Sequence, residues 1–256
     1  MRTFILCAAL AILAMPSMAM ADTGKGCAAL PDHAALKTAL TDARKQANGG
    51  LNLDMWGTIV DRSGRVCAVA YTGADVGAQW PGSRLISAQK ANTANAFSLD
   101  GLALSTANLF TAVQPGGSLF GLQESNPINV PVAYNKAGTL ENFGTTNDPL
   151  TGELIGGVNV FGGGLALYNK DGKVVGAVGV SGDTSCADHN IAWRTRHALS
   201  LDFVSAGVSA DKNDQIIFDI ADGASAGGFG HAACGADVAK VVESLPASRV
   251  VAKAAE

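Results

Sequence analysis

The sequence is poor in charged and aromatic side chains, and it contains no long apolar run. Of its 256 residues, 16% are charged and 6% are aromatic, whereas 48% are hydrophobic. This composition excludes an intrinsically disordered chain, which combines low hydrophobicity with high net charge. The longest apolar run, residues 3–14, is shorter than the roughly 20 residues of a transmembrane helix, so the sequence predicts no membrane span.

Basic clusters and C-x-x-C pairs are also lacking. The formal net charge is −4, from 18 basic and 22 acidic residues, with no basic block. Since nothing in the sequence is suited to neutralising a phosphate backbone, we expect no nucleic acid as a partner. The absence of C-x-x-C argues against a zinc site and against a thioredoxin-like redox centre. Gly162-Gly163-Gly164 precedes a strand pattern, whereas a phosphate-binding loop precedes a helix.

The N-terminal segment, residues 1–21, has the pattern of a secretory signal peptide. Met1-Arg2 is a short positive start, residues 4–14 are apolar, and Ala19-Met20-Ala21 is a small-x-small cleavage site. We expect cleavage after Ala21 and a periplasmic or secreted protein. A buried N-terminal helix is the alternative interpretation of this segment.

Export would place the four cysteines after residue 21 in an oxidising compartment, where an even number of cysteines favours disulfides. They are Cys27, Cys67, Cys186 and Cys234. Three pairings of the four are possible. We favour Cys27–Cys67 and Cys186–Cys234, because each joins a terminal segment to the middle of the chain. In the chain-entropy model, each bond would close a loop of about 40 to 50 residues and stabilise the fold by about 4 kcal/mol.

A unit of two strands and a helix occurs twice. Short β-prone runs around a polar turn with glycine predict a hairpin, and a following run rich in alanine predicts a helix. The first unit has strands at 55–60 and 66–71 and a helix at 83–97; the second has strands at 165–168 and 174–180 and a helix at about 187–201. An amphipathic helix with Leu36, Leu40, Ala43 and Ala47 on one face precedes the first unit.

Adjacent hairpins favour an antiparallel sheet whose faces are covered by helices. Both alternating sets of residues 174–180 are apolar or glycine, which predicts a central strand buried on both faces. Residues 101–164 are dense in Gly, Asn and Pro, with a predicted helix at 102–112, and residues 205–235 are poorly patterned. We interpret both segments as elaborations of one domain.

The chain has four histidines, and each is a candidate ligand residue or a structural residue. These are His33, His189, His197 and His231. On the last predicted helix, His189 and His197 lie about 12 Å apart along the axis and cannot bind one metal ion together. His189 ranks first, because it lies at the start of that helix beside a glycine-rich strand end. His189, Trp193 and Arg196 share one face of the helix.

Other polar residues of the two helices allow two interpretations each. Lys90, flanked by Ala88, Ala91 and Ala94, is either solvated or paired with a carboxylate or a ligand propionate. Asp183 and Asp188 suit the positive end of a helix dipole. Thr93 and Thr106 are either ordinary helix residues or residues whose hydroxyls reach a ligand.

Three motifs resemble the GlcG/HbpS family of haem-binding, sometimes called haem-degrading, proteins. They are Val-Asp-Arg-Ser-Gly-Arg-Val at 60–66, Ser-Ala-Gln-Lys-Ala-Asn-Thr-Ala at 87–94 and Asp-Gly-Lys-Val-Val-Gly-Ala-Val-Gly-Val-Ser-Gly at 171–182. The resemblance covers residues 36–97 and 157–201. It implies an α+β, profilin-like fold, namely a five-stranded antiparallel sheet covered by helices on both faces, and a homo-oligomer.

The family positions that carry over are Lys90, Thr93 and Asp188. The chain departs from the family at Gly163-Gly164-Leu165-Ala166, where the proline of the family motif is missing. It also exceeds the compact family domain. We therefore expect one domain at 22–256, with an insertion at about 101–157 and a C-terminal extension at about 206–256.

These features predict an exported haem-binding protein that sequesters or delivers a tetrapyrrole. Such a pocket needs an apolar slot, one axial ligand and a cation near the propionates. The predicted cofactor-binding residues are His189, as the iron ligand, with Trp193, Lys90, Thr93, Thr106 and Arg84. Arg194 and Arg196 are further available cations.

Two other functions stay open. A haem-degrading enzyme would need a site for oxygen and a source of electrons, and no flavin or nicotinamide motif is visible, so we expect no nucleotide cofactor. A structural or accessory homo-oligomer without a small ligand is the third possibility. The sequence contains no strong set of catalytic residues, and this leaves the third possibility open.

Overall fold

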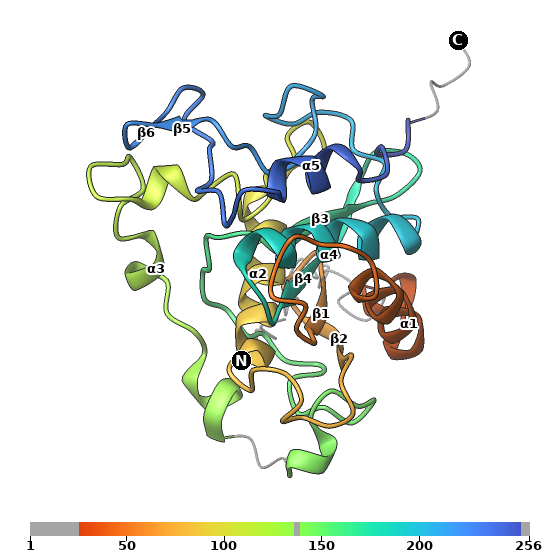
Figure 1. Ribbon diagram of the computed structural model, residues 1–256. Coiled ribbons are helices and arrows are strands. Elements are labelled where there is room, and N and C mark those ends of the chain that lie inside the picture. Colours follow the sequence, from red (N-terminus) through yellow and green to blue (C-terminus); the bar gives the residue numbers. More distant parts are fainter. Residues whose placement is uncertain (1–25, 136–138, 252–256) are drawn as a thin grey trace, which may run out of the picture.

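The main sheet has four antiparallel strands in the order β2-β1-β4-β3. The computed structural model describes residues 26–135 and 139–251 (Figure 1), so the signal peptide expected at 1–21 lies outside the described residues. The strands are β1 (Trp56–Asp61), β2 (Val66–Tyr71), β3 (Gly164–Tyr168) and β4 (Val174–Ser181). The antiparallel arrangement and the central, doubly buried position of β4 agree with the sequence pattern.

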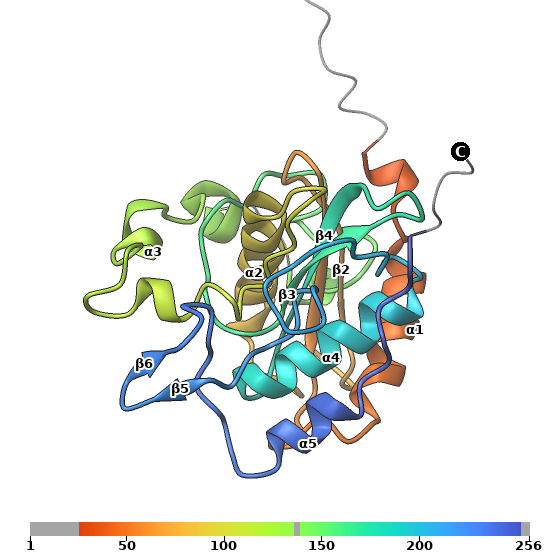
Figure 2. The same cartoon turned by 90° about the horizontal axis from the view of Figure 1, so that it is seen from above.

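Helices cover both faces of this sheet. Helices α1 (His33–Arg44) and α4 (Ser185–Ala198) pack on one face, and α2 (Ser83–Phe97) packs on the other (Figure 2). The remaining elements are short: 3-10 turns at Cys27–Ala29, Thr111–Val113 and Leu140–Asn142, α3 (Leu122–Ser125), a π turn at Pro131–Asn135, β5 (Ile220–Ala221), β6 (Ala224–Ser225) and α5 (Val238–Glu243). None of the helices in the described ranges is long and apolar enough to cross a membrane.

The expected five-stranded sheet is wrong for this chain, because irregular segments meet both edge strands. Beside β2, Val66 donates its N–H to the Glu153 carbonyl at 2.9 Å and accepts from Gly152 at 2.8 Å. Beside β3, Tyr168 donates to the Leu201 carbonyl at 2.7 Å. Gly152 and Ser200 both have positive φ, so the chain turns there instead of continuing as a strand.

Helix α2 lies with its backbone directly on β4. A Cβ atom at Gly179 would lie 1.9 Å from the Ser87 carbonyl oxygen, and one at Gly164 would lie 2.4 Å from the Lys90 carbonyl oxygen. Only glycine permits such an approach. On the other face, Leu36, Ile59, Val178, Val180 and Ile191 form an aliphatic core. Gly179 of β4 and Gly164 of β3 thus allow the close packing of α2 on the sheet.

Helix α4 begins at Ser185, earlier than the start at about residue 187 that the sequence pattern predicts. Thr184 caps α4, with its Oγ1 accepting the Ala187 N–H at 3.2 Å. Asp183, which precedes the cap, instead accepts the N–H groups of Leu51 at 2.8 Å and Leu53 at 3.0 Å. The carboxylate therefore fixes the loop before β1 rather than only opening the helix.

The helix predicted at 102–112 is wrong. The segment forms turns, ending in the 3-10 turn at Thr111–Val113. Asn108 Oδ1 accepts both the backbone N–H of Ser105 at 3.0 Å and its hydroxyl at 2.8 Å. Such local side-chain bonds compete with helical hydrogen bonding. In addition, Ala103 donates to the Ala206 carbonyl of the C-terminal extension at 2.8 Å.

Both favoured disulfides are confirmed. Cys27–Cys67 ties the N-terminal turn to β2 with a Cα–Cα distance of 5.2 Å. Cys186–Cys234 ties the first turn of α4 to the C-terminal extension with a Cα–Cα distance of 6.0 Å. The second bond matters for the site, because it holds the extension against α4.

We predict that Gly179→Ala destabilises the protein by about 1 to 3 kcal/mol or more, because the new methyl group collides with the backbone of α2. Gly101→Ala is the control: its Cβ would meet nothing within 4 Å, so its effect should stay within about 0.5 kcal/mol. Urea denaturation of both variants measures the two changes. Equal stabilities would refute the proposed helix-on-strand contact.

Candidate functional site

The predicted site residues divide between two regions. One is a polar cluster buried where α2, β4 and α4 meet, which we define as Lys90, Asp188, His189 and His231. The other is an apolar cavity beside the first half of α2. Thr93 and Thr106 flank the polar cluster, Trp193 lies one turn further along α4, and Arg84 lines the cavity.

Lys90 and Asp188 form a buried ion pair. Lys90 Nζ donates to Asp188 Oδ2 at 2.7 Å and to the Val180 carbonyl at 3.1 Å, and the two side chains are 0% and 2% exposed. Burial raises the pKa of Asp188 to about 6, against the opposing charge of Lys90, and also lowers the pKa of Lys90. Of the two interpretations of Lys90, the structure selects the paired one, with a carboxylate of this chain.

His189 is buried under the C-terminal extension. Its Nε2 accepts the Ile216 N–H at 3.1 Å. The proton therefore resides on Nδ1, which has no hydrogen-bond partner in the described part of the chain. Burial, with the neighbouring charge of Arg196, lowers the pKa of His189 well below its ordinary value, so the ring is neutral. In this conformation Nε2 is occupied, and coordination of iron there would require residue 216 to move.

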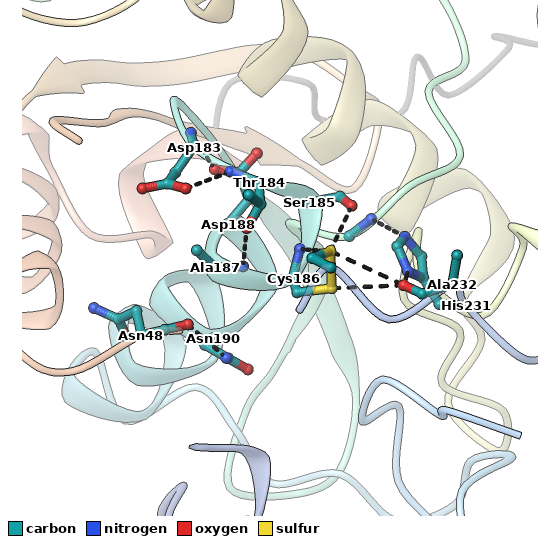
Figure 3. The surroundings of a disulfide bond; sticks show 12 residues. Asn48, Asp183, Thr184, Ser185, Cys186, Ala187, Asp188, Asn190, His231 and Ala232 are labelled. Atoms are coloured by element: carbon teal, nitrogen blue, oxygen red, sulfur yellow. Dashed lines mark hydrogen bonds between the residues drawn. A yellow bond between two sulfur atoms is a disulfide. The ribbon is translucent and has the colours of Figure 1, made fainter. Parts of the chain in front are cut away.

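His231 comes from the extension and closes the cluster from the other side. Its Nε2 accepts the Gly162 N–H at 3.3 Å, and its Nδ1 donates to the Ala232 carbonyl at 2.7 Å. Burial lowers its pKa to about 4. Figure 3 shows His231 and Ala232 next to the disulfide at the start of α4. No sequence pattern places His231 here, because residues 205–235 lack a periodic pattern.

Thr93 and Thr106 fix the strand entry over the polar cluster. Thr93 Oγ1 donates to the Gln89 carbonyl at 2.8 Å and accepts the Asn159 N–H at 2.9 Å. Thr106 Oγ1 donates to the Phe161 carbonyl at 2.7 Å and accepts the Gly164 N–H at 2.9 Å. Both hydroxyls thus hold residues 159–164 in place.

The far half of α4 is also covered by the extension. Trp193 Nε1 donates to the Pro246 carbonyl at 2.8 Å, and its ring centre lies 6.1 Å from that of His189. Arg196 makes two 2.7 Å bonds with Asp214, and both side chains are fully buried. Arg194 bonds the loop after α1 instead, with 2.8 Å to Gln46. The C-terminal segment therefore covers the face that carries His189, Trp193 and Arg196, and Trp193 also lines a cavity of about 690 Å³ between α4 and this segment.

The apolar cavity has a volume of about 800 Å³ and lies against the first half of α2. Arg84, Leu85 and Gln89 line it from the helix, and Tyr134 and Phe143 line it from the insertion. Tyr134 is 67% exposed, as is usual for a side chain at a rim. The cavity is thus built jointly by α2 and by residues 133–134 and 140–143, which lie far from it in the sequence.

Arg84 shapes this cavity through its partners. Its Nε donates to Asp148 Oδ2 at 2.9 Å, a second guanidinium nitrogen bonds the other carboxylate oxygen, and its carbon lies 3.9 Å from the Phe143 ring centre. Its charge is already balanced by Asp148. Sequence reasoning found Arg84 but missed Tyr134 and Phe143, since no local pattern links residues 130–145 to α2.

The two regions differ in what they can do chemically. The polar cluster is closed, and each charged group in it has a partner in this chain. The cavity is of the size that takes a small molecule or cofactor, for which roughly 300–1,000 Å³ is typical. Tyr134 is the one residue among its described lining whose side chain is of a type that ligates haem iron.

We predict that Lys90→Met destabilises the protein by about 3 to 5 kcal/mol, because it leaves a carboxylate buried without its counter-charge. The control is Lys173→Met, which removes an exposed pair with Asp100, where the side chains are 63% and 50% exposed. That change should cost less than about 1 kcal/mol. Similar losses in the two variants, measured by urea denaturation, would contradict the structural importance of Lys90.

We predict that stability falls as the pH drops from about 6.5 towards about 4, because the unfolded chain binds protons that buried His231 and His189 refuse; below about pH 6 the raised pKa of Asp188 offsets one of these two contributions. Each such group contributes a slope of up to about 1.4 kcal/mol per pH unit. His231→Gln should reduce the slope of stability against pH by up to about 1.4 kcal/mol per pH unit. His33→Gln, which removes a histidine outside the cluster, is the control. Urea denaturation across this range checks it, and an unchanged slope in His231→Gln would contradict it.

Comparison with known proteins finds one matching family. A family model for haem-degrading, HbpS-like proteins matches residues 32–196. A search of curated proteins gave no match.

Three solved structures are similar to this chain. ORFY of Klebsiella pneumoniae is 25% identical, with 66% of this chain and 90% of that chain covered and a TM-score of 0.44. PduOC in a complex with haem is 24% identical, with 67% and 94% covered and a TM-score of 0.46. A double mutant of Streptomyces reticuli HbpS is 17% identical, with 75% and 99% covered and a TM-score of 0.42. Since the family model spans more than half of the sequence, the chain belongs to the HbpS-like family of haem-degrading proteins.

Proposed function

We propose that this protein is exported, binds haem or a related tetrapyrrole, and sequesters or delivers it without degrading it. Family membership supports haem as the ligand. The observation that carries the proposal is the cavity of about 800 Å³ beside α2, with its apolar and aromatic lining. A flat apolar macrocycle needs such a slot, and burial of its faces supplies most of the binding free energy.

The cavity fits haem better than the polar cluster does. At the cluster, His189 Nε2 accepts from Ile216, and no space is available without moving the extension. At the cavity, Leu85 and Phe143 offer apolar contacts, and Tyr134 offers a phenol for ferric iron. Bound haem would supply a redox-active iron centre there. We therefore assign Tyr134 as the axial ligand, with His189 as the competing candidate.

The cavity is better suited to binding haem than to degrading it. Oxidative degradation needs a polar site for oxygen and protons beside the macrocycle. Among the described residues that line the cavity, Arg84 is the one with a charged side chain, and Asp148 already pairs with it. These features support binding as the function, and haem degradation is the alternative that the experiment below tests.

Export is supported by the two disulfides. Such bonds form and persist in oxidising compartments. We propose that the signal peptide is removed after Ala21 and that the mature chain, 22–256, is one domain. Its insertion at about 101–157 lines the cavity, and its extension at about 206–256 covers His189. A homo-oligomer, which the family resemblance implies, can be measured by size-exclusion chromatography with light scattering.

We predict a shifted Soret band when the purified protein is titrated with micromolar hemin. Tyr134→Phe should weaken binding by about tenfold or more, which is about 1.4 kcal/mol. Leu85→Glu should abolish binding, because it places a charge in the apolar slot. His189→Ala is the matched control, and its affinity should remain that of the wild type.

Other outcomes would change the assignment. Loss of binding in His189→Ala but not in Tyr134→Phe would move the site to the polar cluster. No spectral change at micromolar hemin would refute haem binding and favour the structural or accessory homo-oligomer. Ascorbate added to the complex separates the remaining two functions: a persistent Soret band supports a binder, and its decay supports an enzyme.

A further inference from the structure

The two disulfides lie in opposite polar surroundings. Cys234 Sγ accepts the Cys186 N–H at 3.2 Å and lies 3.4 Å from the Ser185 hydroxyl, at the first turn of α4 (Figure 3). Cys27 Sγ instead lies 3.9 Å from the Asp61 carboxylate, and Cys67 Sγ lies 3.5 Å from a backbone carbonyl. One sulfur therefore faces hydrogen-bond donors at a helix N-terminus, and the other pair faces oxygen acceptors.

These surroundings make the two bonds unequal in thiol exchange. The sulfur that leaves carries a negative charge, and donors and a helix N-terminus stabilise it. A nearby carboxylate has the opposite effect on Cys27. The Ala232 carbonyl lies 3.6 Å from Cys186 Sγ and 3.9 Å from Cys234 Sγ, so one neutral acceptor also lies near this pair. Cys234 is also partly exposed, whereas Cys186 is buried.

A histidine completes a ligand set at the same place. The ligand atoms of Cys186, Cys234 and His231 all lie within 4.8 Å of one another. In a tetrahedral thiolate site with metal–sulfur bonds of about 2.3 Å, two sulfurs lie about 3.8 Å apart, so a small opening of the reduced pair suffices. To bind the cation, His231 would give up one hydrogen bond: the Gly162 N–H at 3.3 Å if it binds through Nε2, or the Ala232 carbonyl at 2.7 Å if it binds through Nδ1.

The Cys27–Cys67 pair has a carboxylate, and not an imidazole, as its third potential ligand. Asp61 is the third residue of its set. Asp61 Oδ1 accepts three bonds, from the Ser63 N–H at 2.9 Å, the Ser63 hydroxyl at 2.8 Å and the Arg65 N–H at 3.0 Å. These bonds fix the carboxylate in the β1–β2 turn, with Oδ2 3.9 Å from Cys27 Sγ, where its charge opposes a thiolate. The Cys27–Cys67 pair therefore serves as an internal control for reduction.

We propose that Cys186–Cys234 is an exchangeable disulfide whose reduced thiols, with the imidazole of His231, bind a thiophilic divalent cation of the zinc type. The reductant is a dithiol. Its thiolate attacks Cys234 Sγ, the partly exposed sulfur, and Cys186 leaves as a thiolate at the first turn of α4; the second thiol of the reductant then closes its own disulfide and releases Cys234 as a thiolate, which the Cys186 N–H and the Ser185 hydroxyl stabilise. Two electrons and two protons pass to the cysteines, and the cation displaces the thiol protons. The proposal is independent of haem binding.

The first test is graded reduction of the wild-type protein with dithiothreitol, followed by alkylation and mass spectrometry. Cys186 and Cys234 should become labelled at a reductant concentration about tenfold or more below that needed for Cys27 and Cys67. Ser185→Ala, which removes one donor to Cys234, should narrow this gap. Simultaneous opening of both bonds, or earlier opening of Cys27–Cys67, overturns the proposal.

The second test is a Co²⁺ titration of the selectively reduced wild-type chain after the reductant is removed. We expect a sulfur-to-cobalt charge-transfer band and the visible bands of tetrahedral cobalt, both displaced by Zn²⁺. His231→Ala should weaken Co²⁺ binding by about tenfold or more. The oxidised protein is the control and should show neither band. Absence of the charge-transfer band in the reduced wild type, or full affinity in His231→Ala, overturns the proposal.

Discussion

The buried ion pair between Lys90 and Asp188 is the interaction on which the rest of the site depends. It joins α2 to α4 across the end of β4, where Lys90 also bonds the Val180 carbonyl. An unpaired charge in this position would cost several kcal/mol. The glycines of the strand entry adapt to it: a Cβ at Gly163 would lie 2.3 Å from the Val180 carbonyl oxygen and 2.9 Å from Lys90 Nζ.

This closure decides where a ligand can be held. The polar cluster fills the space between the helices, and the extension seals it through His231 and the Cys186–Cys234 bond. The apolar cavity of about 800 Å³ lies on the outer side of α2, where residues 133–134 and 140–143 supply a second wall. These residues and the C-terminal segment thus have different effects: the first build a cavity, and the second closes the polar cluster.

Much of the framework follows from local pattern. Helix α2 has the bounds expected from its sequence, and β2 does too, because alternation, glycine turns and helix-forming runs act over a few residues. The disulfide pairing was accessible because four cysteines allow few choices. The helix expected at 102–112 failed because Asn108 bonds its neighbours locally and Ala103 pairs with the distant extension.

The candidate site was harder to predict from the sequence, because it depends on contacts between residues that are far apart in the chain. Lys90 and Asp188 are separated by 98 residues, and no pattern in either helix says that they meet. His189 was ranked first among the histidines from its place at the helix start, but the residue whose N–H it accepts, Ile216, lies in an unpatterned segment. Tyr134 was missed for the same reason: its closeness to Arg84 is created by the fold of the insertion alone.

The central claim is that haem lies in the cavity beside α2 and not at the polar cluster. Resonance Raman spectroscopy of the ferric haem complex tests this most directly, since it identifies the axial ligand. The account predicts tyrosinate vibrations that disappear in Tyr134→Phe and persist in His189→Ala. A histidine-ligated spectrum that is lost in His189→Ala and unchanged in Tyr134→Phe would contradict it.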